Sequence, residues 1–443
     1  MTFKVIDGGN NAPVPQVNKK IRLLMMSDNP MLHTGMAVVL REIALGLHKT
    51  GKYEIVIAGW GYNGYPHNFP FPMLPASTRD FAKDGYPQAG IPGFAQMIDS
   101  VRPDVVWALG DAWMLNYIKD LPNRNKFKYV QYMPIDGSPV PDYWAPWIEH
   151  VDQLVLYSKY GVSEVNKTAP QIKTEMIYHG THPERYYPLP QAVIDDVKSK
   201  IVYHTVNENN QIEQRAGLPK DAFVIGTLAR NQPRKNFDKV IKAFKIFSEN
   251  KPNAYLWLHT AMQDAAYNLP QLVYTYKLYG KVLFTPNYTL VNGLPENELN
   301  MLMNIWDAHF LPTQGEGFGI PILETMSAGC PQVVTDYTSH MEWCGPASEL
   351  IPVVENDDFI TGIPHPVERA IPKPSECVKC LDKLYYNKEH KLELSKKARE
   401  IAESMTWDKT IPDWDRVIMQ TFLGTNKNSQ NKADSLTSNA IKI

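Results

Sequence analysis

Short apolar runs alternate with amphipathic stretches along the first half of the chain. Residues 21–27 form an apolar run that ends in turn residues, and residues 36–50 place apolar side chains at helical spacing before Gly51. This order predicts a strand, a loop and a helix. The series continues with further apolar runs at residues 53–60, 104–110, 128–134 and 152–158. Short, fully apolar strands separated by helices or loops are typical of a parallel sheet covered on both faces.

A second series of the same kind follows a break near residue 185. Pro188 and Pro190 terminate regular structure there, so we expect a hinge at residues 182–190. The second series predicts helices at residues 237–249 and 296–306, and strands at residues 223–229, 255–260, 281–287, 308–312 and 331–336. Two α/β units therefore follow one another in the chain.

The composition is that of a folded protein without a strong charge bias. Hydrophobic residues make up 44% of the 443 residues and charged residues 21%, values close to those of ordinary globular proteins. At roughly 150 residues per domain, the length fits two or three domains. Lysine and arginine number 45 against 47 aspartates and glutamates, so the net charge of -2 excludes a global attraction to polyanions. Nucleic acid could be a partner only through a local patch.

The number of cysteines and the lack of a long apolar segment indicate the cellular compartment in which the protein is expected. Four cysteines are too few for a disulfide framework and fit a reducing compartment. Cys377 and Cys380 form a CxxC pair on one face of an expected helix, and we expect no metal site because no matching second pair follows. With no apolar leader or long apolar segment, a cytoplasmic protein without a transmembrane segment is expected. The sequons at Asn166 and Asn287 are then chance matches.

The densest chemical signal is a glycine-rich turn within residues 307–336. The turn Gly317-Phe318-Gly319-Ile320 follows an apolar strand that ends at Pro312, and Pro321 sits where a helix would have its first turn. Gly329 follows the last turn of that helix. Unpaired backbone N–H groups at a helix N-terminus, next to the carboxyl end of a parallel strand, bind phosphate or another anion.

Two glutamates flank this turn. Glu316 precedes the helix and Glu324 lies about one turn inside it, so we expect both carboxylates to approach one ligand. A carboxylate accepts paired hydrogen bonds from vicinal hydroxyls such as those of a sugar or a ribose. For either glutamate alone, a favourable helix-end charge or an exposed side chain would be the better explanation. Together with the glycine turn, the pair favours a ligand site.

Basic residues gather where the second series begins. The segment GTLARNQPRKN (226–236) leaves a strand and enters a helix, and it carries Arg230, Arg234 and Lys235. Arg230 as a planar fork and Lys235 as a point charge are suited to grip a diphosphate. Solvated loop charges are the alternative interpretation.

In this order and spacing, the basic segment and the two-glutamate turn resemble the nucleotide-sugar half of retaining glycosyltransferases of family 4. Residues 27–59 are similar, more weakly, to the opening strand, glycine loop and helix of that family. Residues 177–189 are similar to its domain-crossing segment, and residues 405–414 to the segment before the terminal helix. The resemblance covers about residues 20–423; the two-glutamate motif is highly specific and the N-terminal loop is not.

The resemblance implies a GT-B fold, an α/β architecture of two Rossmann-like domains with parallel sheets that face an interdomain cleft. Residues 19–185 would form the acceptor domain, completed by a crossing helix at about 412–423. Residues 190–410 would form the nucleotide-sugar donor domain. The polar residues 424–443 are expected to be a flexible tail.

The resemblance also implies an activity. It is retaining transfer of a hexose or pentose from a UDP- or GDP-sugar to the hydroxyl of a glycan, lipid-linked or other small acceptor, without metal or cofactor. Arg230 and Lys235 would neutralise the departing diphosphate, Glu316 would hold sugar hydroxyls, and Glu324 the ribose diol. Further donor contacts would come from Gly317, Phe318, Gly319, Ile320 and Gly35. Closure of the domains would exclude water.

One position departs from the family pattern. Many members carry a histidine just after the strand that here spans residues 128–134, whereas this chain offers Asp136. Asp136 could orient an acceptor hydroxyl or act as a weak base. A turn aspartate before Gly137 is an equally good account.

Loops rather than the scaffold usually bind the acceptor, so the sequence leaves the identity of the acceptor, and other functions, open. Residues 60–94 and 132–147 offer aromatic platforms for a glycan face or a nucleobase. Transfer to a hydroxylated DNA base would use a local basic patch, but the balanced overall charge disfavours it. The patch would comprise Lys119, Arg124, Lys126 and Lys128. A sugar-nucleotide epimerase and a non-catalytic sugar-nucleotide binding protein are further alternatives.

Overall fold

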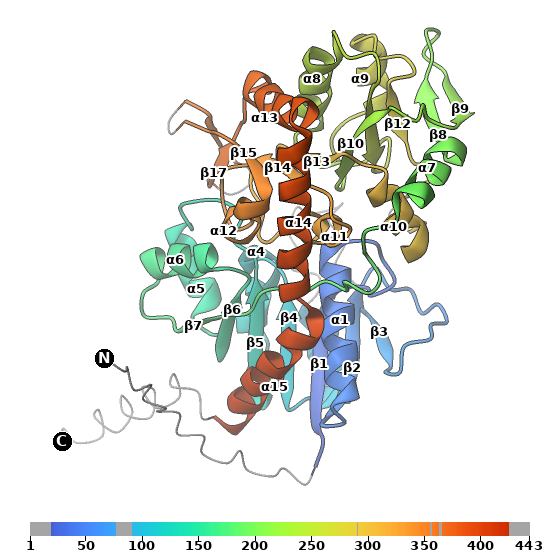
Figure 1. Cartoon of the computed structure of the whole chain (residues 1–443). Coiled ribbons are helices and arrows are strands. Elements are labelled where there is room, and N and C mark those ends of the chain that lie inside the picture. The colour runs from blue at the N-terminus through green and yellow to red at the C-terminus, as the bar shows by residue number, and fades with distance from the viewer. Residues whose placement is uncertain (1–18, 77–90, 290, 355–356, 363–365, 425–443) are drawn as a thin grey trace, which may run out of the picture.

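The chain forms two α/β lobes stacked on one another (Figure 1). The computed structural model describes residues 19–76, 91–289, 291–354, 357–362 and 366–424. The expected tail from residue 425 onward and residues 77–90 of the expected long loop lie outside the described residues.

The first lobe is built on a seven-stranded sheet with the order β3-β2-β1-β4-β5-β6-β7, and every pairing in it is parallel. Its strands are β1 (Ile21–Asp28), β2 (Tyr53–Trp60), β3 (Met73–Ala76), β4 (Val105–Leu109), β5 (Lys128–Met133), β6 (Gln153–Leu156) and β7 (Thr174–Met176). The apolar runs predicted as strands match β1, β2, β4, β5 and β6. The short strands β3 and β7 were not predicted, and β3 lies inside the expected long loop.

Helices cover both faces of this sheet, as a continuous apolar strand requires. In β1, Leu23 and Met25 pack with the cluster that contains α1, whereas Leu24 and Met26 pack with the cluster that contains α3. All four side chains are fully buried. The helices are α1 (Gly35–Lys49), α3 (Ile91–Val101), α4 (Ala112–Leu115), α5 (Ala145–Ile148) and α6 (Lys159–Thr168), with 3-10 turns η2 (Asn116–Asp120), η3 (Arg124–Lys126) and η4 (Asp142–Trp144).

The second lobe is built on an eight-stranded sheet with the order β15-β14-β13-β10-β11-β12-β8-β9. Its strands are β8 (Val202–Val206), β9 (Ile212–Ala216), β10 (Phe223–Leu228), β11 (Ala254–His259), β12 (Val282–Phe284), β13 (Ala308–Leu311), β14 (Gln332–Thr335) and β15 (Ser348–Ile351). The strands from β10 to β15 pair in parallel, but β8 and β9 form an antiparallel hairpin at one edge. This hairpin extends the predicted parallel sheet at one edge. It was not predicted, because β9 is largely exposed and so carries no apolar run.

Helices pack on the second sheet, and a small separate hairpin follows β15. The helices are α7 (Gln191–Lys200), α8 (Phe237–Ser248), α9 (Leu269–Thr275), α10 (Glu296–Asn304), α11 (Ile320–Ser327), α12 (Met341–Cys344), α13 (Pro374–Tyr386) and α14 (Lys388–Ser404), with 3-10 turns η5 (Pro233–Lys235) and η6 (Gly345–Ala347). The hairpin consists of β16 (Phe359–Thr361) and β17 (Glu368–Ala370).

The last described helix, α15 (Trp407–Leu423), returns to the first lobe (Figure 1). It begins a few residues before the predicted crossing helix and packs on α1, β4 and β5. Trp414 is fully buried, with ring centroids 5.4 Å from Trp107 and 4.6 Å from Tyr132. Where the chain crosses between lobes, Thr181 N donates to Met405 O at 2.9 Å, so the two crossing segments lie side by side.

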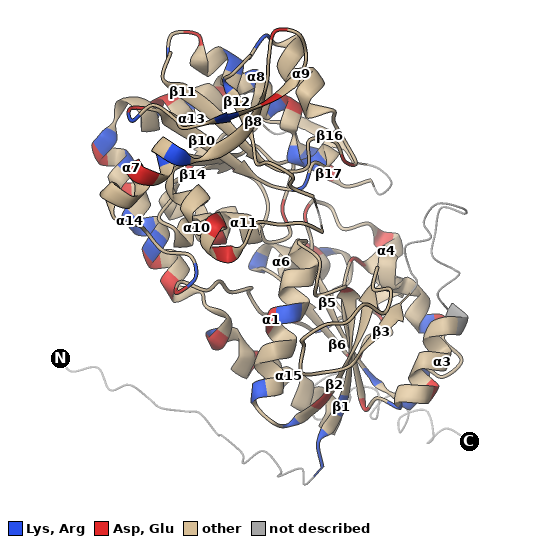
Figure 2. Ribbon diagram, turned by 90° about the vertical axis from the view of Figure 1, so that its right-hand side faces the viewer, with Lys and Arg blue, Asp and Glu red and all other residues tan. Residues whose placement is uncertain are grey.

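Basic and acidic residues are interspersed over the outer helices of both lobes (Figure 2). The basic patch considered for DNA is neutralised by neighbouring carboxylates. Its ion pairs are Lys119–Asp120 at 2.8 Å, Arg124–Asp152 at 2.9 Å, Lys126–Asp99 at 2.7 Å and Lys128–Asp152 at 3.2 Å. Among the described helices, none combines the length and the apolar character needed to span a membrane.

Candidate functional site

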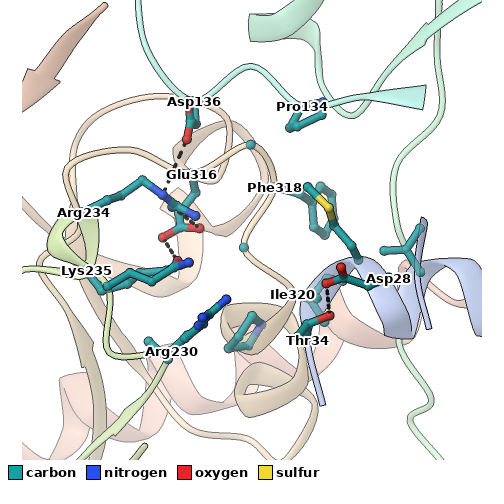
Figure 3. Close-up of a pocket in the computed structure, with 18 of the residues that line it drawn as sticks. Asp28, Thr34, Pro134, Asp136, Arg230, Arg234, Lys235, Glu316, Phe318 and Ile320 are labelled. Carbon is teal, nitrogen blue, oxygen red and sulfur yellow. Dashed lines mark hydrogen bonds and ion pairs between the residues drawn. The ribbon is translucent and has the colours of Figure 1, made fainter. Parts of the chain in front are cut away.

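A cavity of about 700 Å³ lies between the lobes, where the carboxyl ends of strands from both sheets meet (Figure 3). Open α/β sheets bind ligands at this end of their strands. The cavity is lined from the first lobe by Asp28, His33, Thr34, Gly35, Met36, Val39, Asp111, Trp113, Met114, Pro134, Asp136, Tyr157 and His179. From the second lobe it is lined by Leu228, Ala229, Arg230, Gln232, Arg234, Lys235, Tyr288, Glu316, Gly317, Phe318, Gly319, Ile320 and Pro321.

The glycine turn connects β13 to α11 as the sequence predicts. Gly319 caps the helix with φ 97°, a left-handed conformation that favours glycine. The Phe318 ring is buried against Trp343 at 4.9 Å and His179 at 4.5 Å between ring centroids, which anchors the turn. Within the described residues, the N–H groups of Phe318 and Gly319 have no hydrogen-bond acceptor. The turn therefore offers free donors to an anion in the cavity.

Glu316 lies at the centre of a buried charge cluster. Lys235 Nζ lies 2.5 Å from Glu316 Oε1, and Arg234 Nη1 lies 3.1 Å from Glu316 Oε2 (Figure 3). Burial alone would raise the pKa of Glu316, but Lys235 and Arg234 together hold it well below its usual range. Glu316 is therefore an ionised carboxylate, which can only accept hydrogen bonds.

The cations of this cluster keep an excess of positive charge. Burial, reinforced by Arg234, lowers the pKa of Lys235 to about 8 even though Glu316 opposes the shift. Lys235 is thus charged at neutral pH and loses its proton more readily than an exposed lysine. Two cations share one carboxylate, so the cluster retains charge with which to bind an anionic group.

Arg230 lines the same cavity from the end of β10 and has its own partner. Its Nε lies 2.7 Å and its Nη2 3.3 Å from the Asp264 carboxylate. This forked pair fixes the guanidinium plane near the cavity. The structure thus brings Arg230, Lys235, Glu316 and the glycine turn together.

Glu324 departs from the sequence expectation. It is half-buried on α11 and is not among the residues that line the cavity. Burial raises the pKa of Glu324 to about 7, opposed by Arg41 and reinforced by Glu42 and Glu296. Of the two glutamates, Glu316 lines the cavity and Glu324 lies behind it on α11, so the expected contact of Glu324 with the ligand stays a prediction. In α11, Glu324 is four residues beyond Ile320, a rise of about 6 Å away from the turn.

The first lobe presents the start of α1 to the cavity. Thr34 caps this helix by accepting a hydrogen bond from Ala37 N at 3.2 Å, and its hydroxyl donates to Asp28 at 2.6 Å. A Cβ at Gly35 would meet only Ile320 Cδ1, at 4.0 Å. Gly35 lines the cavity as predicted for a close approach.

Asp136 lies at the opposite side of the cavity, after β5 (Figure 3). Its Oδ1 is 2.8 Å from Arg369 Nη1, and its Oδ2 is 3.5 Å from Arg234 Nε. Both arginines belong to the second lobe. A Cβ at Gly137 would approach Glu368 O to 2.9 Å, so the glycine permits a close interlobe contact. Asp136 thus has a partner on each oxygen and is more than a turn residue.

Sequence reasoning missed three cavity residues on α4 and just before it: Asp111, Trp113 and Met114. Burial raises the pKa of Asp111 to about 7; Asp136 adds to the shift, while Arg234 and Arg369 oppose it. Nothing in the local pattern distinguishes these residues. Their position directly after β4, beside the end of β5, was the available signal.

One histidine of the cavity wall and the CxxC cysteines of α13 are buried side chains. His179 is buried, its Nδ1 lies 2.9 Å from Tyr132 Oη, and burial lowers its pKa to about 3. Cys377 and Cys380 are both buried thiols on α13. Over the part of the chain that the structure describes, no group of three or more His, Cys, Asp or Glu side chains is arranged to hold a metal ion.

Comparison with known proteins gives a family match to part of the chain and a fold match to almost all of it. Residues 208–364 match the family described as Glycosyl transferases group 1. The O-antigen chain mannosyltransferase RfbU of Salmonella typhimurium is 29% identical over 143 residues, which cover 32% of this chain and 37% of that relative. The chain thus spans little more than a third of the length of this curated relative.

Structural similarity extends over almost the whole chain. Sucrose-phosphate synthase from Thermosynechococcus elongatus has a TM-score of 0.70 at 13% identity and covers 91% of this chain and 100% of its own. Anabaena HepE, solved in complex with UDP and glucose, has a TM-score of 0.62 at 15% identity and covers 90% and 99%. At such identities the similarity shows the fold alone, and the predicted GT-B fold is confirmed. The chain therefore has the GT-B fold, and residues 208–364 within it are similar to the Glycosyl transferases group 1 family.

Proposed function

We propose that this chain is a retaining glycosyltransferase of the family 4 type, which moves a sugar from a nucleoside diphosphate sugar to an acceptor hydroxyl. One observation carries the proposal: Glu316, Lys235, Arg230 and the free amides of the glycine turn line a single interlobe cavity. On this proposal, residues 190–410 bind the donor. Residues 19–185, completed by α15, bind the acceptor.

The donor side answers the main electrostatic demand of the reaction. When the bond between the anomeric carbon and the diphosphate breaks, its electron pair leaves with the phosphate oxygen. Lys235 and Arg230 stabilise that charge, and Glu316 accepts hydrogen bonds from hydroxyls of the donor sugar. Because these side chains supply the positive charge, we infer that transfer needs no metal. The UDP and glucose bound to Anabaena HepE support a nucleotide-sugar donor, with UDP or GDP as its nucleotide.

On the acceptor side, a new glycosidic bond forms and the acceptor hydroxyl loses its proton. The acceptor oxygen forms the new bond to the anomeric carbon, and its proton passes to Asp136 or to the departing phosphate. Trp113 lines the same cavity as Asp136 and offers an aromatic side chain, which suits a sugar ring. The mannosyltransferase relative, named for O-antigen chains, supports a carbohydrate acceptor.

The ion pairs across the basic patch argue against DNA as the acceptor. Four free, buried cysteines fit the expected cytoplasmic setting.

A donor screen by thermal shift tests the proposal. A nucleotide sugar that binds the folded chain at 100 times its Kd should stabilise it by about 2.7 kcal/mol. The bound donor is then incubated with sugar acceptors in EDTA, and the anomeric configuration of the product is read by NMR. A product with the donor's configuration supports retention, and an inverted product contradicts it. A new epimer from donor alone would favour an epimerase, and binding without any product would favour a binding protein.

A further inference from the structure

The hairpin β16–β17 reaches from the second lobe to the first. Glu368 N donates to Ser138 O at 2.7 Å, and two residues further Ala370 N donates to Gln314 O at 3.0 Å. Tyr337 Oη adds a second link, because it donates to Glu368 O at 2.9 Å and lies 3.2 Å from Ser138 N. Strand β17 is thus fixed to the loop after β5 on one side and to the segment before the glycine turn on the other.

Arg369 stands between these two attachments and grips Asp136. Its Nη1 donates to Asp136 O at 2.6 Å and lies 2.8 Å from Asp136 Oδ1. The same nitrogen therefore binds both the backbone and the side chain of one residue. Only 17% of the Arg369 side chain is exposed, so the contact is sheltered from water and weakly screened.

The remaining contact on the Asp136 carboxylate is looser and shared. Arg234 Nε lies 3.5 Å from Asp136 Oδ2, while its Nη1 lies 3.1 Å from Glu316 and donates to Gly315 O at 2.7 Å. Arg234 is thus committed to the donor side of the cavity. Without Arg369, nothing among these contacts would hold the backbone of residue 136.

We propose that Arg369 is a positioning residue for sugar transfer, which holds the Asp136 carboxylate on the acceptor side of the cleft when the lobes are together. This inference rests on the proposed function, because it takes Asp136 to face the acceptor hydroxyl. Arg369 lies beyond residues 208–364, so the family match does not include it. The hairpin brings Arg369 into contact with Asp136, although the two residues are far apart in the sequence.

Because the Arg369 charge affects the pKa of Asp111, the pH dependence of transfer tests the role of Arg369. The groups that face Asp111 are Asp136 after β5, Arg234 on η5, Arg369 on β17, the Trp113 side chain and Tyr157. Burial and Asp136 raise the pKa of Asp111 to about 7, and the Arg369 charge opposes that rise. Loss of this charge should raise the pKa further. The acidic limb of the transfer rate should then move to higher pH in Arg369→Gln and stay in place in Arg369→Lys, which keeps the charge.

The experiment compares Arg369→Gln, Arg369→Lys and a matched control, Arg416→Gln. The control removes an arginine–carboxylate pair, Arg416 with Glu175 at 2.7 Å, outside the cleft. Donor Kd is measured by calorimetry, and kcat, acceptor KM and the pH profile by product formation. Because small misplacements in an active site can cost about 100-fold, we expect kcat to fall roughly 10- to 100-fold in Arg369→Gln. Donor Kd should stay within about twofold. Arg369→Lys should recover part of kcat, and Arg416→Gln should behave as wild type.

Two outcomes would overturn the inference alone. In the first, Arg369→Gln keeps the wild-type kcat and pH profile while the wild type binds donor and transfers sugar. In the second, Arg369→Gln does not fold and Arg369→Lys turns over at the wild-type rate. A wild type that binds no donor and transfers no sugar would instead refute the proposed function, and the inference with it.

Discussion

The two walls of the cleft hold their charged groups differently. The donor wall, residues 228–235 and 314–321, pairs Lys235 with Glu316 inside the second lobe. The acceptor wall, residues 111–114 and 134–138, belongs to the first lobe, but its Asp136 is held by Arg234 and Arg369 of the second. The donor wall is therefore held by a contact within one lobe, whereas the acceptor wall depends on contacts between the lobes. On the proposed function, we expect donor binding to depend less on the approach of the lobes than the alignment of the acceptor does.

The largest effect should follow from breaking the donor wall. Lys235→Ala removes a buried cation that would stabilise the departing diphosphate, and we expect kcat/KM to fall about 100- to 1000-fold. Donor affinity should fall as well, which calorimetry with UDP or GDP measures. Lys126→Ala serves as control, because it removes a surface lysine that pairs with Asp99 at 2.7 Å. Equal turnover in the two variants would remove Lys235 from the proposed mechanism.

A break in the acceptor wall should leave donor binding intact. Asp136→Asn keeps the size of the side chain but removes the charge that pairs with Arg369. We expect kcat to fall about 10- to 100-fold, as for loss of a general base or a positioned hydroxyl. The donor Kd should change by less than about twofold. Asp136→Asn with weakened donor binding and normal kcat would assign Asp136 to the donor wall instead.

Donor affinity and kcat should depend on pH in different ranges, because the donor wall and the acceptor wall carry groups with different pKa values. Lys235, with a pKa of about 8, loses its charge above that pH, so donor affinity should be steady near pH 7 and fall by up to about tenfold per pH unit above 8. Asp111, with a pKa of about 7, becomes protonated below that pH, which removes a negative charge from the cavity wall that carries Asp136, so we expect kcat to fall on the acidic side. Calorimetry and rate measurements from pH 5.5 to 9.5 check both limbs. A Lys235→Arg variant that keeps the alkaline fall in affinity would contradict the first assignment.

The smallest effect concerns Glu324, behind the donor wall. Burial raises its pKa to about 7, so the folded chain binds this proton more tightly than the unfolded chain does. Its contribution to stability is complete below the unfolded pKa and is lost as the pH rises through 7. Glu324→Gln should therefore stabilise the fold by about 1 kcal/mol at pH 8 and change nothing at pH 5. Thermal melts at both pH values measure this difference. Donor affinity in the same variant tests the proposed contact with the ribose.

The fold could be predicted where the strands are buried on both faces. The runs that form β1, β2, β4 and β5 are continuous and apolar, and their ends were placed within about a residue. The hairpin β8–β9 escaped prediction because it lies at a sheet edge, where β9 is mostly exposed. An exposed edge strand lacks the apolar signal on which such a prediction depends.

The site could be predicted where its chemistry is contiguous in the chain. Glu316 and the glycine turn follow β13, and Lys235 follows β10. These two strands are parallel neighbours, so the residues after their carboxyl ends lie close together. Arg369 could not be placed, because it meets Asp136 only through the packing of the two lobes. Asp111 follows β4 beside the end of β5, but no motif marks it in the sequence. The spacing of Glu324 predicts the same cavity, whereas the structure places this half-buried residue on α11 outside the residues that line it.

The return of α15 to the first lobe has a consequence for synthesis on the ribosome. Trp414, which closes the aromatic cluster with Trp107 and Tyr132, is translated some 280 residues after Tyr132, at about 5–20 residues per second. The nascent first lobe must wait for tens of seconds with that aromatic face uncovered. It is during this interval that a chaperone would find its binding surface, and the arrival of the final helix would end the exposure.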